Sequence, residues 1–409
     1  MPGFFYGQTH RCFRTFIKFI RFTTSLHMKN ISSKLPNAKT TIFTTIGNLA
    51  RQHNAIDLSQ GFPNFEADSK LMRLVTKAMS DGYNQYAPMF GSFPLREAIV
   101  QKIKALHGKS YHVEKEITIT VGATQAIYTA ITAFVNQGDE VIVFKPAYDC
   151  YEPAIAINGG VSILVEMNGD RFKIDWEKFR VRITPKTKMV IINTPHNPSG
   201  TLLSKNDMLA LQQSLLGTDI ILISDEVYEH IVFDDLTHES VSRFPDLASR
   251  SIVCGSFGKT FHVTGWKVGY CVAPAELMQE FRKIHQFNVF SVDHPTQRAL
   301  AQYLQEPKHY LELSDFYQKK RDYFINALNQ SSFKVLPSQG TYFQLLDYSA
   351  LTDENDVSYA QKLITNHRLA CIPISVFNID QKDNQKLRFC FAKTQATLKK
   401  AINILNSLK

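Results

Sequence analysis

From about residue 115 the sequence alternates short apolar runs with longer segments whose apolar positions recur at helical spacing. Several runs are almost continuous Ile and Val, which is typical of strands covered on both faces. The expected strands are 117–121, 140–144, 162–166, 189–193, 220–224, 251–254 and 268–272, and the expected helices between them are 123–135, 205–216 and 275–287. This alternation predicts βαβ units and an α/β fold, in which a mostly parallel seven-stranded sheet lies between helices.

The pattern differs on either side of this region. Residues 36–65 are rich in loop-forming residues, and a helical pattern follows at 68–80. After about residue 300 we expect long charged helices over 298–330, strands at 333–336, 341–346 and 386–391, and a final helix at 394–408. This pattern predicts a separate, smaller α+β domain. The predicted division is a leader or extension outside the fold (1–27), an N-terminal arm with part of the small domain (28–65), a large domain (66–297) and a C-terminal small domain (298–409).

The basic charge of the chain is concentrated near its start. The formal net charge is +9, but residues 1–35 carry six basic side chains and no acidic one, so the remainder carries about +3. We therefore expect no nucleic-acid partner. The apolar stretch in this leader is too interrupted to span a membrane. It fits a transit peptide, a weak secretory signal, or translated sequence upstream of a start at Met28, and we favour the last.

The cysteines and histidines show no metal-ligand spacing. Six cysteines are scattered without a CxxC pair, and thirteen histidines include no HExxH motif. We expect no catalytic metal. Cys150, Cys254, Cys271 and Cys390 lie in apolar runs and are expected to be buried free thiols, which favours a reducing, cytoplasmic location.

Polar residues follow the expected strands at one end of each. Ligands of open parallel sheets bind in the crevice at the carboxyl ends of the strands, so these residues would line one crevice. They are Gly122-Ala123-Thr124, Tyr148, Asn197, Asp225 with Tyr228, and Ser256. This placement predicts a ligand site that draws on most strands of the sheet.

Two lysines near this crevice indicate a specific cofactor. Lys259 lies in Ser256-Phe257-Gly258-Lys259-Thr260, eight residues before Lys267. An amine that can form a Schiff base, with a second cation for a phosphate, is what pyridoxal 5'-phosphate (PLP) requires. Taken alone, Lys259 would more simply be a solvated surface lysine. A P-loop has little support, because Val253 stands where that motif needs glycine.

Four further features each have a structural alternative. Gly122-Ala123-Thr124 opens a helix whose free N–H groups favour a phosphate, although Thr124 could simply cap it. Asp225 after an apolar strand needs a donor such as a protonated pyridine nitrogen, or else caps the next helix. Arg388 could bind a carboxylate with both arms of its guanidinium, or form a structural ion pair. Tyr148 could stack on a flat ring or serve only as a wall.

Together these residues resemble the fold type I, PLP-dependent class I aminotransferases over nearly all of residues 30–409. The match in order and spacing includes Tyr86, Gly122-Ala123-Thr124, Tyr148, His196-Asn197-Pro198-Ser199-Gly200, Asp225-Glu226-Val227-Tyr228, Ser256-Phe257-Gly258-Lys259-Thr260, Lys267 and Arg388. Within the family, the chain is most similar to the kynurenine and methionine aminotransferase branch. That branch carries lysine at the position of Lys267, where many other members carry arginine.

The resemblance implies a role for each matching residue. Lys259 would hold the cofactor and move a proton, Asp225 would hold the pyridine N–H, and Tyr228 and Asn197 would bond the ring hydroxyl. The remaining implied roles are stacking by Tyr148, phosphate binding by Ala123, Thr124, Ser256 and Lys267 with Tyr86 of the partner subunit, and substrate carboxylate binding by Arg388, Asn197 and the Gly61 backbone. The family further implies a homodimer with shared active sites.

The implied activity is ping-pong transfer of an amino group to a 2-oxo acid. Aspartate-specific relatives use an arginine in the segment that corresponds to residues 284–292, which here has none and offers Phe287 and Phe290. We therefore expect methionine or aromatic donors, with kynurenine and glutamine as further candidates.

Three other functions compete with this one. A PLP-dependent β-lyase acting on cysteine conjugates or cystathionine would use the same fold and lysine. A transcription regulator would need a winged-helix module of about 70 residues, for which residues 1–35 are too short. A catalytically dead scaffold is disfavoured because every chemical position is filled.

Overall fold

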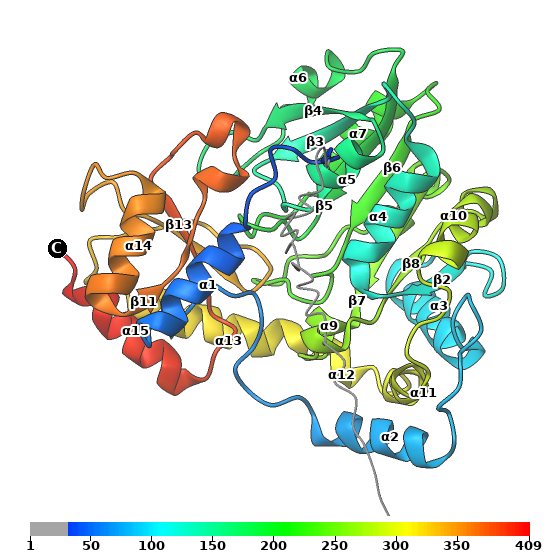
Figure 1. Cartoon of the computed structure of the whole chain (residues 1–409), viewed down its shortest axis with the longest axis horizontal. Coiled ribbons are helices and arrows are strands. Elements are labelled where there is room, and N and C mark those ends of the chain that lie inside the picture. Colours follow the sequence, from blue (N-terminus) through cyan, green and yellow to red (C-terminus); the bar gives the residue numbers. More distant parts are fainter. Residues whose placement is uncertain (1–31) are drawn as a thin grey trace, which may run out of the picture.

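The structure of the chain is a computed structural model, which describes residues 32–409 (Figure 1). The predictions about the basic leader and about a start at Met28 lie outside the described residues.

A seven-stranded sheet forms the centre of the molecule (Figure 1). Its strands in spatial order are β2 (Ile117–Thr120), β8 (Gly269–Val272), β7 (Ser251–Ser256), β6 (Ile221–Asp225), β5 (Thr187–Asn193), β3 (Glu140–Lys145) and β4 (Val161–Glu166). Strand β8 runs antiparallel to both of its neighbours, whereas β7, β6, β5, β3 and β4 pair in parallel. The predicted mostly parallel sheet is therefore confirmed, and each expected strand agrees with the observed one to within about two residues.

Helices cover both faces of this sheet, which explains the nearly continuous apolar runs. Ile191 and Ile223 pack into one buried cluster with residues of α4 (Gly122–Phe134) and α10 (Ala275–Asn288). Their neighbours along the strands, Val190 and Leu222, belong to a second cluster on the other face, which includes Met208 of α7 (Lys205–Leu215). The other helices of this part of the chain are α2 (Ser69–Ser80), α3 (Phe93–His107), α5 (Tyr151–Ile157), α6 (Trp176–Arg180), α8 (Pro245–Ala248) and α9 (Phe257–Thr260).

The C-terminal part of the chain forms a second, antiparallel sheet. Its order is β12 (Ile372–Pro373), β13 (Lys386–Cys390), β10 (Phe343–Asp347) and β9 (Lys334–Val335). The N-terminal segment joins this part, because β1 (Ile56–Asp57) pairs in parallel with β11 (Leu369–Ala370). In Figure 1 the blue helix α1 (Ile42–Gln52) accordingly lies beside the orange and red elements. The helices here are α13 (Leu313–Asn326), α14 (Asp356–His367) and α15 (Gln395–Ser407). The exact domain boundaries remain a prediction.

One detail of the predicted secondary structure is wrong. Helix α1 (Ile42–Gln52) lies in the segment that the sequence indicates as loop-rich. Its apolar residues share one face and the Thr41 side chain caps its first turn, but threonines within it weaken the helical signal. The helices expected over 298–330 are present as α11 (His294–Tyr303), α12 (Lys308–Leu311) and α13.

Several properties of the described residues bear on the setting of the protein. No helix in residues 32–409 is long and apolar enough to cross a membrane. The cysteines of that range are free thiols, and Cys254, Cys271 and Cys390 are buried as expected, whereas Cys150 is only partly buried.

Candidate active site

A cavity of about 140 Å³ lies where the parallel strands of the large sheet end. Because β8 is antiparallel, its beginning lies at this edge, and the residue two before it, Lys267, reaches the cavity too. The cavity is lined by Gly122, Ala123, Thr124, Ile127, Tyr148, Asn193, Asn197, Asp225, Val227, Tyr228, Ser256, Gly258, Lys259, Thr264, Lys267 and Val268. The structure therefore brings together most of the residues that the sequence analysis singles out, in the crevice where ligands of such sheets bind.

One end of the cavity is shaped for an anion. Gly122 is the first residue of α4 and has a φ of +69°, a conformation that favours glycine. A Cβ atom added there would lie 3.4 Å from Nζ of Lys267. The cation therefore stands directly beside the free N–H groups of the first helical turn, and both favour a phosphate.

Lys259 lies in the short helix α9, which follows directly after β7. Its Nζ donates a hydrogen bond of 3.1 Å to the carbonyl oxygen of Gly61 and lies 5.8 Å from the ring centre of Tyr228. Burial, helped by the positive charges of Arg388 and Lys267, lowers the pKa of Lys259 to about 8. About a tenth of the amine is therefore neutral at pH 7, far more than for an ordinary lysine, and the neutral form is the nucleophile.

Asp225 is the last residue of β6 and is buried, with 4% of its surface exposed. Its Oδ2 accepts a hydrogen bond of 2.6 Å from the hydroxyl of Tyr151, and its Oδ1 accepts one of 3.4 Å from the Val227 N–H. Burial raises the pKa of Asp225 to about 6. In residues 32–409 it has no ion-pair partner, so this buried carboxylate would gain from a donor in the cavity.

Arg388 belongs to the other sheet and contacts Asn197, which lines the cavity. It lies on the central strand β13 with 1% of its surface exposed, and burial lowers the pKa of its guanidinium. Its Nη1 donates a hydrogen bond of 2.7 Å to Oδ1 of Asn197, and its Nη2 donates one of 3.2 Å to the carbonyl oxygen of Ser59. Its Nε has no hydrogen-bond partner among the described residues. The alternative of a structural ion pair finds no partner there either, so the guanidinium can still bind a ligand carboxylate.

Gly61, Tyr148 and Tyr228 lie at or beside the same cavity. Tyr148 and Tyr228 line the cavity. The carbonyl oxygen of Gly61 accepts hydrogen bonds from Lys259 and, at 2.6 Å, from the hydroxyl of Tyr342.

Tyr86 lies away from the cavity of its own chain. It is 80% exposed and its ring packs against that of Phe290, with 5.3 Å between the ring centres. Phe287 is 86% exposed and Phe290 is 48% exposed, so neither forms a buried wall within one chain.

Some residues of the site have no assigned role in the sequence analysis. Asn193, the last residue of β5, accepts a hydrogen bond of 2.7 Å from the Asn197 N–H and donates one of 2.9 Å to the carbonyl oxygen of Asp225. It begins the polar run 193–200 after an apolar strand, which the sequence places at the crevice without giving Asn193 a role of its own. Tyr151 and Tyr342 make their contacts with residues distant in sequence, which local patterns do not reveal.

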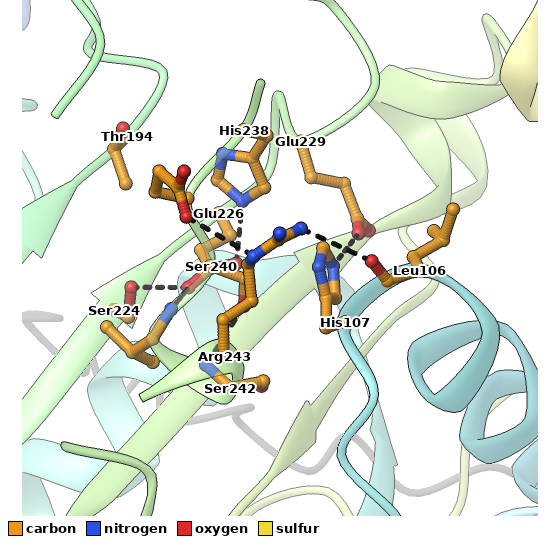
Figure 2. A network of polar contacts seen from close by, with 12 residues as sticks. Leu106, His107, Thr194, Ser224, Glu226, Glu229, His238, Ser240, Ser242 and Arg243 are labelled. Carbon is orange, nitrogen blue, oxygen red and sulfur yellow. Dashed lines mark hydrogen bonds and ion pairs between the residues drawn. The ribbon is translucent and has the colours of Figure 1, made fainter. Parts of the chain in front are cut away.

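A buried polar network lies next to the cavity and includes Glu226, the residue after Asp225 (Figure 2). Oε1 of Glu226 accepts hydrogen bonds from the Ser224 hydroxyl at 2.7 Å and from the Val241 N–H at 3.1 Å. Its Oε2 lies 2.8 Å from Nε2 of His238. Burial alone would raise the pKa of Glu226, but His238 holds it below its usual range. These contacts fix the backbone that carries Asp225.

The same network continues to Glu229, which follows Tyr228. Its Oε1 accepts hydrogen bonds from Nζ of Lys102 at 2.5 Å and from the hydroxyl of Tyr270 at 2.9 Å. Its Oε2 lies 3.9 Å from Nε2 of His107. Figure 2 marks this contact between Glu229 and His107 with a dashed line. The turn that presents Asp225 and Tyr228 to the cavity is therefore held on both sides by buried charged side chains.

The residues of the cavity fit PLP by their chemistry. Lys259 offers an amine of lowered pKa for the aldehyde, and the start of α4 with Lys267 offers an anion site for the phosphate. Asp225 offers a buried carboxylate for the pyridine N–H, and Tyr148 offers an aromatic ring.

The chain is similar in sequence and in structure to known aminotransferases. Residues 53–405 match the family model described as aminotransferase class I and II. The chain is 50% identical over 377 residues to methionine aminotransferase of Escherichia coli strain K12, covering 92% of this chain and 98% of that protein. It is 34% identical to kynurenine–oxoglutarate transaminase of Dictyostelium discoideum, covering 88% and 92%. The crystal structure of YbdL from Escherichia coli, described as having a methionine aminotransferase function, matches with a TM-score of 0.90 and 49% identity over 93% of this chain and all of that one.

Proposed function

The chain belongs to the class I and II aminotransferase family, whose members use PLP, and we propose that its amino donors are methionine and the aromatic amino acids. As an aminotransferase it moves the amino group of an amino acid to a 2-oxo acid. The observation that carries the assignment of the site is Lys259, an amine of lowered pKa that shares one cavity with an anion site and a buried carboxylate.

We assign cofactor-binding roles to the residues around Lys259. Bound PLP supplies an aldehyde for covalent attachment and a ring that accepts electrons from the substrate. The Asp225 carboxylate would hold the proton of the pyridine nitrogen, and the side chains of Tyr228 and Asn197 would bond the ring hydroxyl. Tyr148 would supply an aromatic contact for the ring. Ala123, Thr124, Ser256 and Lys267 would bind the phosphate.

Lys259 has a second proposed role, as the base that moves the substrate proton. When its amine is not bonded to the cofactor, it would accept the proton from Cα of the substrate and later release it. Its lowered pKa suits both directions of this transfer, because the neutral and charged forms are both accessible near neutral pH.

The substrate carboxylate is proposed to bind Arg388, with help from Asn197 and from the Gly61 backbone. Support comes from the buried guanidinium, whose Nε has no partner among the described residues and whose Nη1 bonds Asn197. In the structure Lys259 donates to the Gly61 carbonyl oxygen, so this backbone segment lies within reach of the reacting amine.

Two observations support the proposed donors. The relative that shares 50% identity over nearly its whole length is named methionine aminotransferase. The segment 284–292 contains no arginine, so the distal carboxylate of aspartate would stay unpaired at a cost on the order of several kcal/mol. Burying an apolar or aromatic side chain instead contributes roughly 1–3 kcal/mol. Kynurenine and glutamine remain candidate donors, since a kynurenine transaminase is among the relatives.

The active unit is proposed to be a homodimer with shared active sites. Tyr86, Phe287 and Phe290 are exposed apolar side chains, and in this proposal they contact the second copy. Tyr86 would then reach the phosphate of the partner's cofactor. Sedimentation equilibrium tests the assembly, and a monomer that is fully active at assay concentration would contradict it.

Transamination is favoured over β-elimination. The relatives reported above carry the names of aminotransferases and transaminases. A panel of amino donors with 2-oxoglutarate and several other 2-oxo acids, with product identification by mass spectrometry, tests both reactions. We expect a new amino acid and a new 2-oxo acid in equal amounts. Release of pyruvate, ammonia and a thiol from cysteine conjugates at a higher rate would favour the lyase.

A further inference from the structure

Tyr151 is a buried tyrosine whose hydroxyl donates a hydrogen bond to the carboxylate of Asp225. It is the first residue of α5 and has 2% of its surface exposed. The distance of 2.6 Å from its hydroxyl to Oδ2 of Asp225 is that of a short, charge-assisted hydrogen bond. Both groups are buried, so water cannot readily replace this bond if it is lost.

The other contacts of the Asp225 carboxylate are weaker. The Val227 N–H lies 3.4 Å from Oδ1, near the limit for a hydrogen bond. No lysine, arginine or histidine within residues 32–409 lies at ion-pair distance from Asp225. The titratable groups around it are Cys150 and Tyr151 at the start of α5, Tyr148 after β3, Glu226 and Tyr228 after β6, Cys254 on β7 and Lys259 on α9.

The balance of these neighbours makes the charge of Asp225 depend on Tyr151. Burial raises the pKa of Asp225, and the negative charge of Glu226 acts in the same direction. The hydrogen bond from Tyr151, the Val227 N–H and the charge of Lys259 lower the pKa again. When Lys259 is bonded covalently to a cofactor, its positive charge is reduced. The hydrogen bond from Tyr151 then accounts for more of the effect that lowers the pKa of Asp225 and keeps it ionised.

The geometry also fixes the orientation of the carboxylate. Because Tyr151 engages Oδ2, rotation of the carboxyl group is restricted and Oδ1 keeps its remaining lone pair for a donor in the cavity. The ring of Tyr151 packs edge-on against Tyr148, with 6.0 Å between ring centres. The same short segment therefore carries both Tyr148, whose ring lines the cavity, and Tyr151, whose hydroxyl orients Asp225.

We propose that Tyr151 is a positioning residue that keeps the Asp225 carboxylate charged and oriented toward the ring nitrogen of the bound cofactor. The inference rests on the proposed role of Asp225, and it adds a residue that does not itself line the cavity. Tyr151 acts through Asp225 rather than on the substrate.

The test compares Tyr151→Phe with Tyr348→Phe. Both substitutions remove the hydroxyl of a buried tyrosine that donates a short hydrogen bond, but Tyr348 donates to the Glu354 carbonyl oxygen at 2.7 Å, beside the small sheet. The equilibrium affinity of each apoenzyme for PLP is measured by fluorescence titration from pH 5.5 to 8.5, together with kcat and KM and the melting temperature.

For Tyr151→Phe we expect PLP affinity at pH 7 to fall about tenfold, and the acid limb of its pH dependence to move up by about one pH unit. Loss of the donor raises the pKa of Asp225, so the charged carboxylate is lost at a higher pH. We expect kcat to fall about tenfold with KM for the amino donor changed less than about threefold. Tyr348→Phe should lower the melting temperature about as much as Tyr151→Phe does, but it should leave the acid limb of PLP binding where it is in the wild type.

The role of Tyr151 would be overturned if Tyr151→Phe kept the acid limb and the kcat of the wild type. It would also be overturned if both variants showed equal shifts. A wild-type protein that binds no PLP would instead contradict the proposed function, so the two failures are distinguishable.

Discussion

Arg388 and Asn197 are joined by a hydrogen bond of 2.7 Å across 191 positions of sequence. Arg388 belongs to the small antiparallel sheet, and Asn197 belongs to the loop that follows β5 of the large sheet. The proposed substrate carboxylate site therefore lies where the two sheets meet, and its geometry depends on both parts of the chain.

Arg388→Lys should retain a positive charge but lose the planar fork that binds a carboxylate with two hydrogen bonds. We expect kcat/KM for the amino donor to fall about 10- to 100-fold, mostly through KM. Arg321→Lys is the matched control, because Arg321 is also buried but pairs with Asp234 at 2.5 Å. That variant should lose stability while KM stays the same. Steady-state kinetics that show equal KM changes in both variants would contradict the role of Arg388.

Lys259→Ala should abolish covalent attachment of the cofactor and transamination together. The wild-type protein is expected to be yellow as purified, and borohydride reduction followed by peptide mass spectrometry should find the cofactor on Lys259. Lys334→Ala, which removes an exposed lysine paired with Asp170, should keep both properties. A reducible cofactor–lysine adduct that persists in Lys259→Ala would show that another lysine carries the chemistry.

Asp225→Asn should preserve the fold but slow the amino-donor half-reaction by several orders of magnitude, because a neutral amide does not hold the pyridine nitrogen protonated. Asp207→Asn provides a comparison, since Asp207 forms the capping box of α7 with Ser204. It should cost about 1 kcal/mol of stability and leave the half-reaction unchanged. Single-turnover rates decide the matter, and a change of less than about tenfold in Asp225→Asn would reduce Asp225 to a structural role.

The rate at which the apoenzyme captures PLP should rise with pH and level off above about pH 8. The neutral amine is the nucleophile, and the pKa of Lys259 is lowered to about 8 by burial and by the charges of Arg388 and Lys267. An ordinary exposed lysine would stay protonated up to a pH of about 10. Stopped-flow absorbance between pH 6.5 and 10 measures the profile, and a rate that still rises tenfold per pH unit at pH 9.5 would contradict the lowered pKa.

Sequence patterns could predict the strands and the chemistry at their ends, since a parallel sheet gathers its carboxyl ends at one edge. Asp225, Lys259 and Asn197 reach the cavity for that reason. The bond from Tyr151 to Asp225 could not be foreseen, because it depends on how α5 packs against β6, 74 residues later. Helix α1 was hidden by the threonines that interrupt its helical pattern.

We expect an aminotransferase with this cavity to prefer amino donors with apolar or aromatic side chains. Methionine is the expected first choice, since a flexible thioether adapts to an aromatic-lined site. The most direct measurement is kcat/KM for methionine, phenylalanine, kynurenine and aspartate with one common 2-oxo acid. We expect values for methionine and phenylalanine at least about tenfold above that for aspartate. A value for aspartate equal to or above those for methionine and phenylalanine would contradict it.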